Sequence, residues 1–493
     1  MQLSITTPAP PNGNKKNLTA LSPIGKSRAV LKGLEKMTIQ CISPIDGSIY
    51  ATRQTLAYAD AKTAARAAKV AQGEWAKRSL NERISLVKAG VAAIGAMNDE
   101  IVPELAWQMG RPIRYGGEFG GFDERASYMA QIAQNALADI EIEDSDAFRR
   151  VIKRVPHGVV LVVAPWNYPY MTAINTIAPA LIAGNTVILK HASQTPLVGE
   201  RLAQAFHGAG VPKDVFQNLF LDHETTSALI SERAFGFVNF TGSVAGGKAM
   251  ESAASGTFTG LGLELGGKDP GYVMEDAHLD AAVDTLIDGA MFNSGQCCCG
   301  IERIYVQEAL FESFVEKAVA TVNGYKLGHP LDPETTLGPM AQTRFADLVR
   351  AQTKEAIAAG ATAHIKPEAF PEDSGAYLMP QILTNVSHDM RIMREESFGP
   401  VVGIMKVSND SEALRLVNDS AYGLTASIWT QDHAIGEALA EDVEAGTVFI
   451  NRCDYLDPAL AWTGVKNSGR GCTLSVLGYE SLTRPKSYHF KEI

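Results

Sequence analysis

Hydrophobic and polar residues alternate along this chain with two different periods. From about residue 55 to 140, apolar positions recur every three or four residues, as in AYADAKTAARAAKVAQGEWAKR and NERISLVKAGVAAIGAM, which predicts helices. Around residue 138 the pattern becomes a strict alternation, in ADIEIEDSD and then FRRVIKRV. This second pattern predicts a β-hairpin, or an extension of a sheet, that leaves the main body of the protein.

Farther along the chain, short apolar runs alternate with helical segments. The runs GVVLVVAP, NTVILK, VFQNLFL and FGFVNFTG predict buried strands, and MTAINTIAPALIAG (ended by Gly184) and PLVGERLAQAFHGAG predict helices between them. A second series begins at DPGYVM, passes through the helix DAAVDTLIDGAMFN and the strand RIYVQ, and ends near TVFIN. The alternation predicts an α/β fold: a Rossmann-like, doubly wound parallel sheet followed by a second α/β domain.

Composition and charge exclude several classes of partner. The net charge of −11 argues against nucleic-acid or anionic-membrane binding, and no apolar run approaches the roughly 18 residues of a membrane span.

Six cysteines in 493 residues do not form a secreted disulfide framework, so we expect reduced thiols and a cytoplasmic protein. Residues 1–37 are basic, with no acid before Glu35, and are predicted to be a disordered tail; a transit peptide to an organelle is the alternative.

Two glycine-rich stretches match nucleotide-binding motifs incompletely. GSVAGGKA, residues 242–249, follows a strand and opens a helix, but Ala249 replaces the hydroxyl that would hold Mg²⁺ in a P-loop. Its glycines still predict a seat for a pyrophosphate, with a tight turn or a P-loop NTPase as alternatives. GLGLELGG, residues 260–267, has Leu265 at the third glycine position and runs into a strand, so it predicts no dinucleotide site.

Three consecutive cysteines stand in FNSGQCCCG, residues 292–300. A cysteine nucleophile needs a neighbour that manages protons and donors that stabilise an oxyanion. Glu264, at the end of a predicted strand, and Asn167, between a strand and a helix, are candidates, although each taken alone is more often a loop acid or a turn residue. We expect no metal site, because three adjacent thiols meet at one tetrahedral centre only through an unusual turn.

A series of segments resembles the aldehyde dehydrogenase superfamily. They are APWNYP, VILK, FTGS followed by Gly247, LELGGK, FNSGQCC, EESFGPV and GVKNSGRG, in the family's order over roughly residues 40–490. The resemblance implies Cys298 as the nucleophile and Glu264 as the general base, with Asn167 and the backbone N–H of Cys298 as the oxyanion hole. It implies oxidation of an aldehyde to the carboxylic acid with NAD(P)⁺, through a thiohemiacetal and a thioester that water hydrolyses.

The same resemblance implies a set of coenzyme-binding residues: Trp166, Lys190, Ser193, Gly242, Ser243, Gly247, Glu396 and Phe398. Ser193 stands where the family often has a glutamate. A carboxylate there would repel a 2′-phosphate and serine does not, so we predict that NADP⁺ is used, preferentially or alongside NAD⁺. His191 replaces a proline of the family pattern, with no consequence that the sequence defines.

The family's substrate pocket falls on a further set of positions: Tyr168, Met171, Thr172, Asn175, Cys297, Cys299, Asp454, Tyr455, Leu456 and Trp462. The set is mostly apolar and aromatic, and the helix face of Asn175 carries no arginine that would clamp a carboxylate. A hydrophobic aliphatic or aromatic aldehyde is therefore predicted, with a semialdehyde such as succinic semialdehyde as the alternative. Arg452 lies close by in sequence, either as an anchor for a substrate or as part of a salt bridge.

The resemblance also implies how the chain is divided and assembled. An arm that leaves the main body exposes sheet edges, so we predict that it pairs with a partner subunit in a homodimer or homotetramer. The predicted parts are a disordered or targeting tail (1–37), an NAD(P)-binding domain (38–137 and 156–264), an oligomerisation arm (138–155 and 475–493) and a catalytic domain (265–474).

Overall fold

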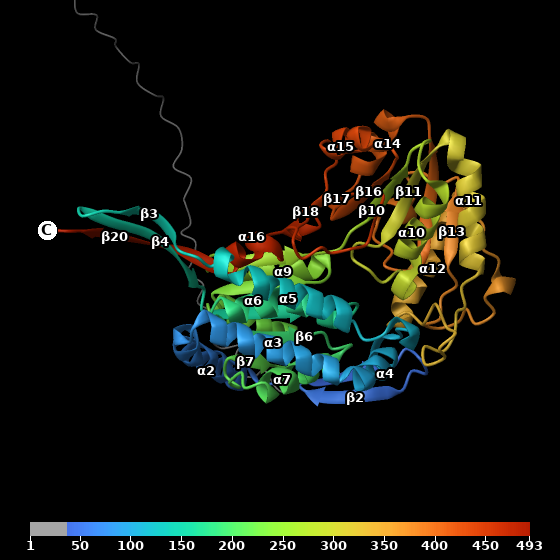
Figure 1. The fold of residues 1–493 in the computed structure, drawn as a ribbon. Helices are drawn as coiled ribbons and strands as arrows, with labels where there is room; N and C mark the ends of the chain where they lie inside the picture. Colours follow the sequence, from blue (N-terminus) through green and yellow to red (C-terminus); the bar gives the residue numbers. More distant parts are fainter. Residues whose placement is uncertain (1–36) are drawn as a thin grey trace, which may run out of the picture. The chain divides into compact units, whose positions relative to one another are not determined.

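Two large β-sheets organise the part of the chain that the computed structural model describes, residues 37–493 (Figure 1). The first sheet has six strands, and its order along the chain reverses between β5 and β8, which are neighbours. Doubly wound sheets bind ligands at such a reversal, at the carboxyl ends of the strands. In spatial order the strands are β19 (Gly469–Arg470), β9 (Gly260–Glu264), β8 (Phe237–Thr241), β5 (Val159–Ala164), β6 (Thr186–His191) and β7 (Phe216–Asn218), all parallel except β19.

Alternate side chains of β5 enter two different cores. Val160 and Val162 pack with helices on one face of the sheet, and Leu161 and Val163 pack with helices on the other. Because both faces are covered, the strand is apolar throughout, which explains the run GVVLVVAP. On the first face lie α3 (Leu80–Ala96), α4 (Asn98–Met109), α5 (Phe119–Ala136), α6 (Pro169–Ile182), α7 (Pro196–Gly208) and α16 (Ser475–Ser481); on the second lie α2 (Tyr58–Lys77), α8 (His223–Ser231) and α9 (Val244–Ala254).

The second large sheet has seven strands and is also covered on both faces. Its strands, in spatial order, are β12 (Thr362–Ala363), β13 (Gln381–Thr384), β14 (Val401–Val407), β11 (Ile301–Gln307), β10 (Asp269–Val273), β16 (Thr425–Trp429) and β17 (Thr447–Ile450), all parallel except β12. α10 (Leu279–Met291) and α11 (Glu308–Asn323) cover one face, and α12 (Thr343–Ala358) and α14 (Asp410–Asn418) cover the other. The predicted α/β class with parallel sheets is confirmed.

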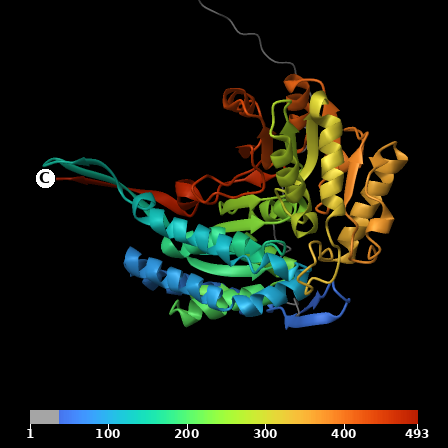
Figure 2. The same ribbon diagram turned by 45° about the vertical axis from the view of Figure 1, so that its right-hand side comes forward.

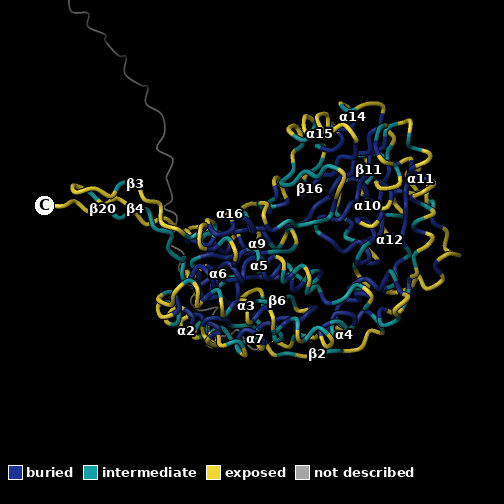
Figure 3. Tube along the Cα trace, viewed as in Figure 1, coloured by how far each residue is buried: buried dark blue, intermediate teal, exposed yellow. Residues whose placement is uncertain are grey.

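A three-stranded antiparallel sheet extends away from both large sheets (Figures 1 and 2). It contains β3 (Ile140–Asp144), β4 (Phe148–Pro156) and the C-terminal β20 (Thr483–Lys491), so the predicted hairpin is confirmed. Most of its residues are exposed or half-buried (Figure 3), including the apolar Ile140, Ile142 and Phe490. Its role in assembly and the predicted domain boundaries stay predictions.

Smaller elements complete the described residues. They are the hairpin β1 (Thr38–Ile42) and β2 (Ile49–Gln54), the pair β15 (Tyr422–Gly423) and β18 (Val465–Lys466), the helices α13 (Arg391–Arg394) and α15 (His433–Ala440), and the 3₁₀ helices η2 (Ile113–Tyr115), η3 (Phe292–Gly295) and η4 (Pro367–Ala369). None of the helices formed by residues 37–493 has the length and apolar character that a membrane span requires. The tail predicted over residues 1–37 lies outside the described residues, apart from Met37.

Candidate active site

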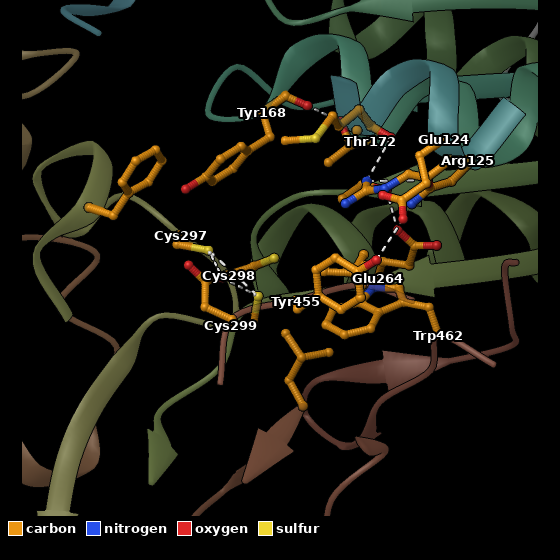
Figure 4. A pocket seen from close by; sticks show the side chains of 18 of the residues that line it. Glu124, Arg125, Tyr168, Thr172, Glu264, Cys297, Cys298, Cys299, Tyr455 and Trp462 are labelled. Carbon is orange, nitrogen blue, oxygen red and sulfur yellow. Dashed lines mark hydrogen bonds between the residues drawn. The ribbon is translucent and has the colours of Figure 1, made fainter. Parts of the chain in front are cut away.

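The site lies where the two large sheets meet. Residues 265–268 connect β9 of the first sheet directly to β10 of the second, so Glu264 stands at this junction. Cys298 precedes β11, the neighbour of β10, at the amino edge of the second sheet. Glu264 and Cys298 line the same cavity of about 220 Å³, which we call the cysteine pocket (Figure 4).

All the residues predicted for the substrate pocket line the cysteine pocket. Its wall comes from the start of α6, the cysteine triplet and the loop after β17, three segments far apart in sequence. The predicted residues found there are Tyr168, Met171, Thr172, Asn175, Cys297, Cys299, Asp454, Tyr455, Leu456 and Trp462, and Gly121, Glu124, Arg125, Thr241, Leu265, Phe292 and Leu424 join them.

A second cavity of about 320 Å³, the switch-point pocket, opens at the reversal between β5 and β8. Cys298 and Glu264 also line it, so the two pockets share these side chains. Of the residues predicted to bind coenzyme, it contains Trp166, Gly242, Ser243, Glu396 and Phe398, together with Asn167.

The other three residues predicted to bind coenzyme lie elsewhere. Ser193 is exposed and lines a different cavity with Arg344. Lys190 is half-buried on β6, and burial lowers its pKa, opposed by the charge of Asp222. Gly247 lies inside α9, where a side chain in its place would meet Leu265.

The helix N-terminus of α9 opens onto the switch-point pocket. The hydroxyl of Ser243, its N-cap residue, accepts a hydrogen bond from the backbone N–H of Gly246 at 3.2 Å. The other N–H groups of a first helical turn have no partner within the helix and attract anions. The position therefore suits a phosphate group, as the incomplete P-loop pattern predicted.

Glu396, in the loop between α13 and β14 of the seven-stranded sheet, also lines the switch-point pocket. Its Oε1 accepts a hydrogen bond from the backbone N–H of Gly267 at 3.1 Å, and burial raises the pKa of its carboxyl to about 8. The neighbouring loop is fixed by buried Glu302, which accepts from the backbone N–H of Ser397 at 2.8 Å and of Phe398 at 2.9 Å. This arrangement holds Phe398 and Glu396 in place at the pocket wall.

Glu264 is a buried carboxylate held by two hydroxyl groups. The hydroxyl of Thr473 donates to Oε1 at 2.6 Å, and that of Thr241 donates to Oε2 at 3.0 Å. Burial raises its pKa, while these two hydrogen bonds and the charge of Arg125 oppose the rise. An acid with a raised pKa in a shared pocket has the properties of a general base.

An unusual turn precedes the cysteine triplet. Asn293, Ser294 and Gly295 have consecutive positive φ angles of 54°, 56° and 70°. A Cβ at Gly295 would overlap the backbone of Gly399, so only glycine fits there. The turn brings the three cysteine sulfurs within 4.8 Å of one another. Three adjacent thiols were expected to converge only through such a turn, and the structure contains it.

The three thiols differ in their surroundings. Cys297 and Cys299 are buried, and their thiols donate to the same oxygen, Oδ1 of Asp454, at 3.1 and 3.0 Å. Cys298 is only half-buried. Interaction with the thiol of Cys297 first, and then with that of Cys299, lowers the pKa of Cys298 to about 6, whereas the pKa of Cys297 rises to about 12. The local geometry therefore favours Cys298 as the thiolate.

Asn167 lies beside this turn. Its Nδ2 donates to the main-chain oxygen of Gln296 at 3.3 Å, and the residue is buried. Gln296 is anchored in turn, because its Oε1 accepts from the backbone N–H of Ala341 at 2.8 Å. The amide of Asn167 and the peptide that precedes the triplet thus form one hydrogen-bonded unit.

Arg125 is a pocket residue that the sequence reasoning missed. It comes from α5, and its Nη1 donates to the main-chain oxygen of Met171 at 3.0 Å and to Oδ1 of Asn175 at 3.3 Å. Its Nε has no hydrogen-bond partner among the described residues. A signal was present, because Arg125 follows Phe122 by three residues and precedes Met129 by four, inside the buried stripe of α5.

Two further residues singled out in the sequence have structural contacts. The Arg452 guanidinium lies 3.7 Å from the ring centroid of Tyr455, and Arg452 is exposed outside the wall of the cysteine pocket. His191 is buried, 3.3 Å from the main-chain oxygen of Pro169 through Nε2 and 3.2 Å from the Thr195 hydroxyl through Nδ1. Burial lowers the pKa of His191 to about 4, so a neutral ring connects the starts of α6 and α7.

Comparison with known proteins identifies the family of the chain. A family model described as the aldehyde dehydrogenase family matches residues 32–488. The chain is 33% identical over 448 residues to a succinate-semialdehyde dehydrogenase [NADP(+)] of Deinococcus radiodurans, covering 90% of this chain and 93% of that protein. It is 35% identical over 430 residues to an aldehyde dehydrogenase of Paenarthrobacter nicotinovorans, covering 85% and 93%.

Solved structures agree as well. A structure of Gox0499, studied for its cofactor and substrate selection, superposes with a TM-score of 0.87 at 32% identity, covering 92% of this chain and 99% of that one. The chain therefore belongs to the aldehyde dehydrogenase family and is an NAD(P)⁺-dependent oxidoreductase that oxidises an aldehyde to a carboxylic acid.

Proposed function

We propose that this enzyme oxidises an aldehyde whose far end carries a carboxylate, such as succinic semialdehyde, with NADP⁺ as a preferred or equal coenzyme. The observation that carries the proposal is the guanidinium of Arg125 in the wall of the cysteine pocket. The relative from Deinococcus radiodurans, a succinate-semialdehyde dehydrogenase [NADP(+)], supports the same substrate.

Arg125 is a buried charge without a carboxylate in contact. Its side chain makes no ion pair within 4 Å among residues 37–493, and only 7% of it is exposed. A buried guanidinium is costly unless a negative group neutralises it. Two more buried polar atoms in the pocket wall, the hydroxyl of Tyr168 and Nδ2 of Asn175, also have no partner among the described residues. A substrate carboxylate would satisfy such donors.

The sequence-based preference for a hydrophobic aldehyde used the helix face of Asn175, which carries no arginine. An arginine is supplied by α5 instead: Nη1 of Arg125 donates a hydrogen bond to Oδ1 of Asn175. Aromatic residues such as Trp462 and Tyr455 still line the pocket, so the carbon chain of the substrate has apolar surroundings. We therefore favour the semialdehyde, which was the alternative, over a purely apolar aldehyde.

We assign the chemical roles as follows. The Cys298 thiolate attacks the aldehyde carbon and forms a C–S bond, and the oxygen takes the negative charge. Nδ2 of Asn167 and the backbone N–H of Cys298 donate to that oxygen. When bound, NAD(P)⁺ would supply the nicotinamide that takes up the hydride released from this carbon. A thioester on Cys298 remains, and Glu264 takes a proton from water, which adds to the thioester and releases Cys298.

The switch-point pocket fits the coenzyme. The start of α9, capped by Ser243, presents backbone N–H groups to a pyrophosphate. The carboxyl group of Glu396 and the ring of Phe398 line the same pocket as Cys298, and we assign them to a ribose hydroxyl and the nicotinamide ring. Lys190 and the exposed Ser193, which flank His191 near the end of β6, are assigned to the adenosine end, where Ser193 carries no negative charge that would repel a 2′-phosphate.

The test compares substrates on the enzyme and on Arg125 variants. We expect kcat/KM for succinic semialdehyde to exceed that for pentanal and benzaldehyde. Arg125→Met should lower it about 10- to 100-fold for succinic semialdehyde alone, the worth of a charge-assisted hydrogen bond. Arg452→Met is the matched control, since Arg452 lies outside the pocket wall. Equal losses on all three aldehydes, or a native preference for benzaldehyde, would contradict the proposal.

We further propose a cytoplasmic homodimer or homotetramer. The exposed edges and apolar side chains of the β3–β4–β20 sheet, such as Ile142 and Phe490, support pairing with a second subunit. Free thiols next to the nucleophile support a reducing compartment, with an organelle as the alternative. Light scattering that finds only the mass of one chain would refute the assembly, and cell fractionation tests the location.

A further inference from the structure

We propose that Cys297, Cys298, Cys299 and Asp454 form a binding site for a thiophilic divalent cation such as Zn²⁺, which inhibits the enzyme by capturing Cys298. The site is built from the nucleophile and its neighbours, yet binding of the ion requires neither substrate nor coenzyme. Metal binding can therefore be measured independently of the proposed substrate.

The ligand atoms already converge without an ion. The three sulfurs lie within 4.8 Å of one another, and those of Cys297 and Cys299 are 3.6 Å apart. Oδ1 of Asp454 is 3.1 Å from the first of these and 3.0 Å from the second. Three potential ligand atoms thus form a small triangle, with the sulfur of Cys298 as a fourth.

The triangle is close to one face of a zinc tetrahedron. With Zn–S bonds of about 2.3 Å and Zn–O bonds of about 2.0 Å, the edges of such a face are about 3.8 Å between sulfurs and about 3.5 Å between sulfur and oxygen. The measured 3.6, 3.1 and 3.0 Å require an expansion of only a few tenths of an ångström. Thiolate ligands select zinc and other soft ions over Mg²⁺ or Ca²⁺.

The backbone holds these ligands in place. The left-handed turn at Asn293, Ser294 and Gly295 carries the triplet. Asp454 itself has a positive φ of 49°, a conformation that is uncommon outside glycine, although aspartate adopts it more readily than most side chains do. Two unusual backbone conformations, more than 150 residues apart in the chain, therefore bring one carboxylate against two thiols.

Binding would have two chemical consequences. The ion replaces thiol protons, so protons are released and affinity rises with pH. It also occupies the sulfur that attacks the aldehyde, so inhibition is competitive with aldehyde and is reversed by a chelator. The enzyme needs no metal for its reaction in this scheme.

The test is a titration of the chelator-treated, reduced full-length enzyme with Co²⁺, an absorbing substitute for Zn²⁺. We expect one ion per chain, thiolate-to-cobalt charge-transfer bands and the intense visible bands of a tetrahedral site, all displaced by Zn²⁺. Cys297→Ala, Cys299→Ala and Asp454→Asn should each weaken binding at least about tenfold, because even residues that only orient metal ligands are worth 10- to 100-fold.

Cys453→Ala is the matched control. Its thiol is buried next to Asp454 but donates to the main-chain oxygen of Thr285 at 3.4 Å and lies outside the pocket wall, so the cobalt spectrum should be unchanged. Circular dichroism of each variant separates loss of a ligand from loss of the fold. A Cys297→Ala/Cys299→Ala enzyme that folds and binds Co²⁺ as tightly as the native enzyme would overturn the proposal, as would cobalt bands of six-coordinate geometry.

Discussion

Nη2 of Arg111 donates a 2.5 Å hydrogen bond to the main-chain oxygen of Asn167. Arg111 also forms a buried ion pair with Glu118. The other carboxylate oxygen of Glu118 accepts from the backbone N–H groups of Tyr170 at 3.0 Å and Met171 at 2.9 Å. The ion pair therefore fixes both the peptide that carries the proposed oxyanion donor and the first turn of α6.

Arg111→Met is expected to destabilise the enzyme and slow it. Removal of one partner from a buried ion pair leaves an uncompensated charge and costs about 3–5 kcal/mol. Urea unfolding measures this loss, and kcat should fall, because the peptide of Asn167 and the first turn of α6, which carries the pocket residue Met171, both lose their anchor.

Arg111→Met/Glu118→Gln is the matched control for this change. Glutamine removes the charge and keeps an oxygen that accepts from Tyr170 and Met171, so stability should recover while kcat stays low. A loss of less than about 1 kcal/mol in Arg111→Met would show that the pair contributes less to stability than its burial indicates.

Glu264→Gln is expected to separate the two halves of the reaction. Hydride transfer does not need a base at this position, so a first turnover of NADPH should still appear as a rapid burst. Hydrolysis of the thioester should then fall about 10²- to 10⁴-fold, the usual contribution of a general base. Stopped-flow absorbance of NADPH distinguishes the burst from the steady state.

The pH dependence of this step follows from the buried carboxyl. Burial raises the pKa of Glu264 above its ordinary value, and only the ionised form accepts a proton from water. Steady-state kcat should therefore fall as pH decreases through this raised pKa. In Glu264→Gln this dependence of kcat on pH should disappear. A burst that vanishes together with kcat would contradict a role confined to hydrolysis.

Ser193→Glu is expected to move the coenzyme preference towards NAD⁺. A carboxylate at this exposed position would accept from the 2′-hydroxyl of NAD⁺ and repel the 2′-phosphate of NADP⁺. The ratio of kcat/KM for NADP⁺ to that for NAD⁺ should fall by at least about tenfold, or about 1.4 kcal/mol. Ser193→Gln is the uncharged control. A native enzyme that prefers NAD⁺ by more than about a hundredfold would refute NADP⁺ use.

The sequence was most informative where a local pattern and a family motif agree. The apolar run of β5 predicted a strand buried on both faces, and the structure places its alternate side chains in two cores. The register of Gly295 and Gln296 predicted Cys298 as the nucleophile, and only Cys298 of the triplet is half-exposed and lines both pockets.

Contacts across long sequence separations were beyond such patterns. Arg125 lies 50 residues before Asn175, and nothing in the periodicity of α5 says which helix it meets. The convergence of the thiols on Asp454 joins residues 155 to 157 positions apart and depends on left-handed turns that only coordinates reveal. The position of the Arg125 charge and the contacts of the cysteine thiols in this pocket therefore depend on the tertiary structure.

The reactivity of Cys298 towards iodoacetamide should change with pH around an unusually low midpoint. Interaction with the neighbouring thiols of Cys297 and Cys299 lowers its pKa to about 6, so the thiolate fraction rises as pH increases through 6 and levels off above it. An ordinary thiol has a pKa near 8.5 and would be mostly protonated at about pH 7. The alkylation rate, followed by mass spectrometry of the tryptic peptide, measures the midpoint directly.

Variants of the neighbouring thiols test the cause of this low midpoint. Cys297→Ala and Cys299→Ala each remove one neighbouring thiol, so the midpoint should move upward. A midpoint that is higher by about one pH unit lowers the alkylation rate near pH 5 about tenfold. Cys453→Ala leaves both neighbouring thiols in place and should keep the native midpoint. A midpoint above about 8 in the native enzyme, near that of an ordinary thiol, would mean that the triplet does not activate its middle thiol. A midpoint that stays unchanged in both Cys297→Ala and Cys299→Ala would mean the same.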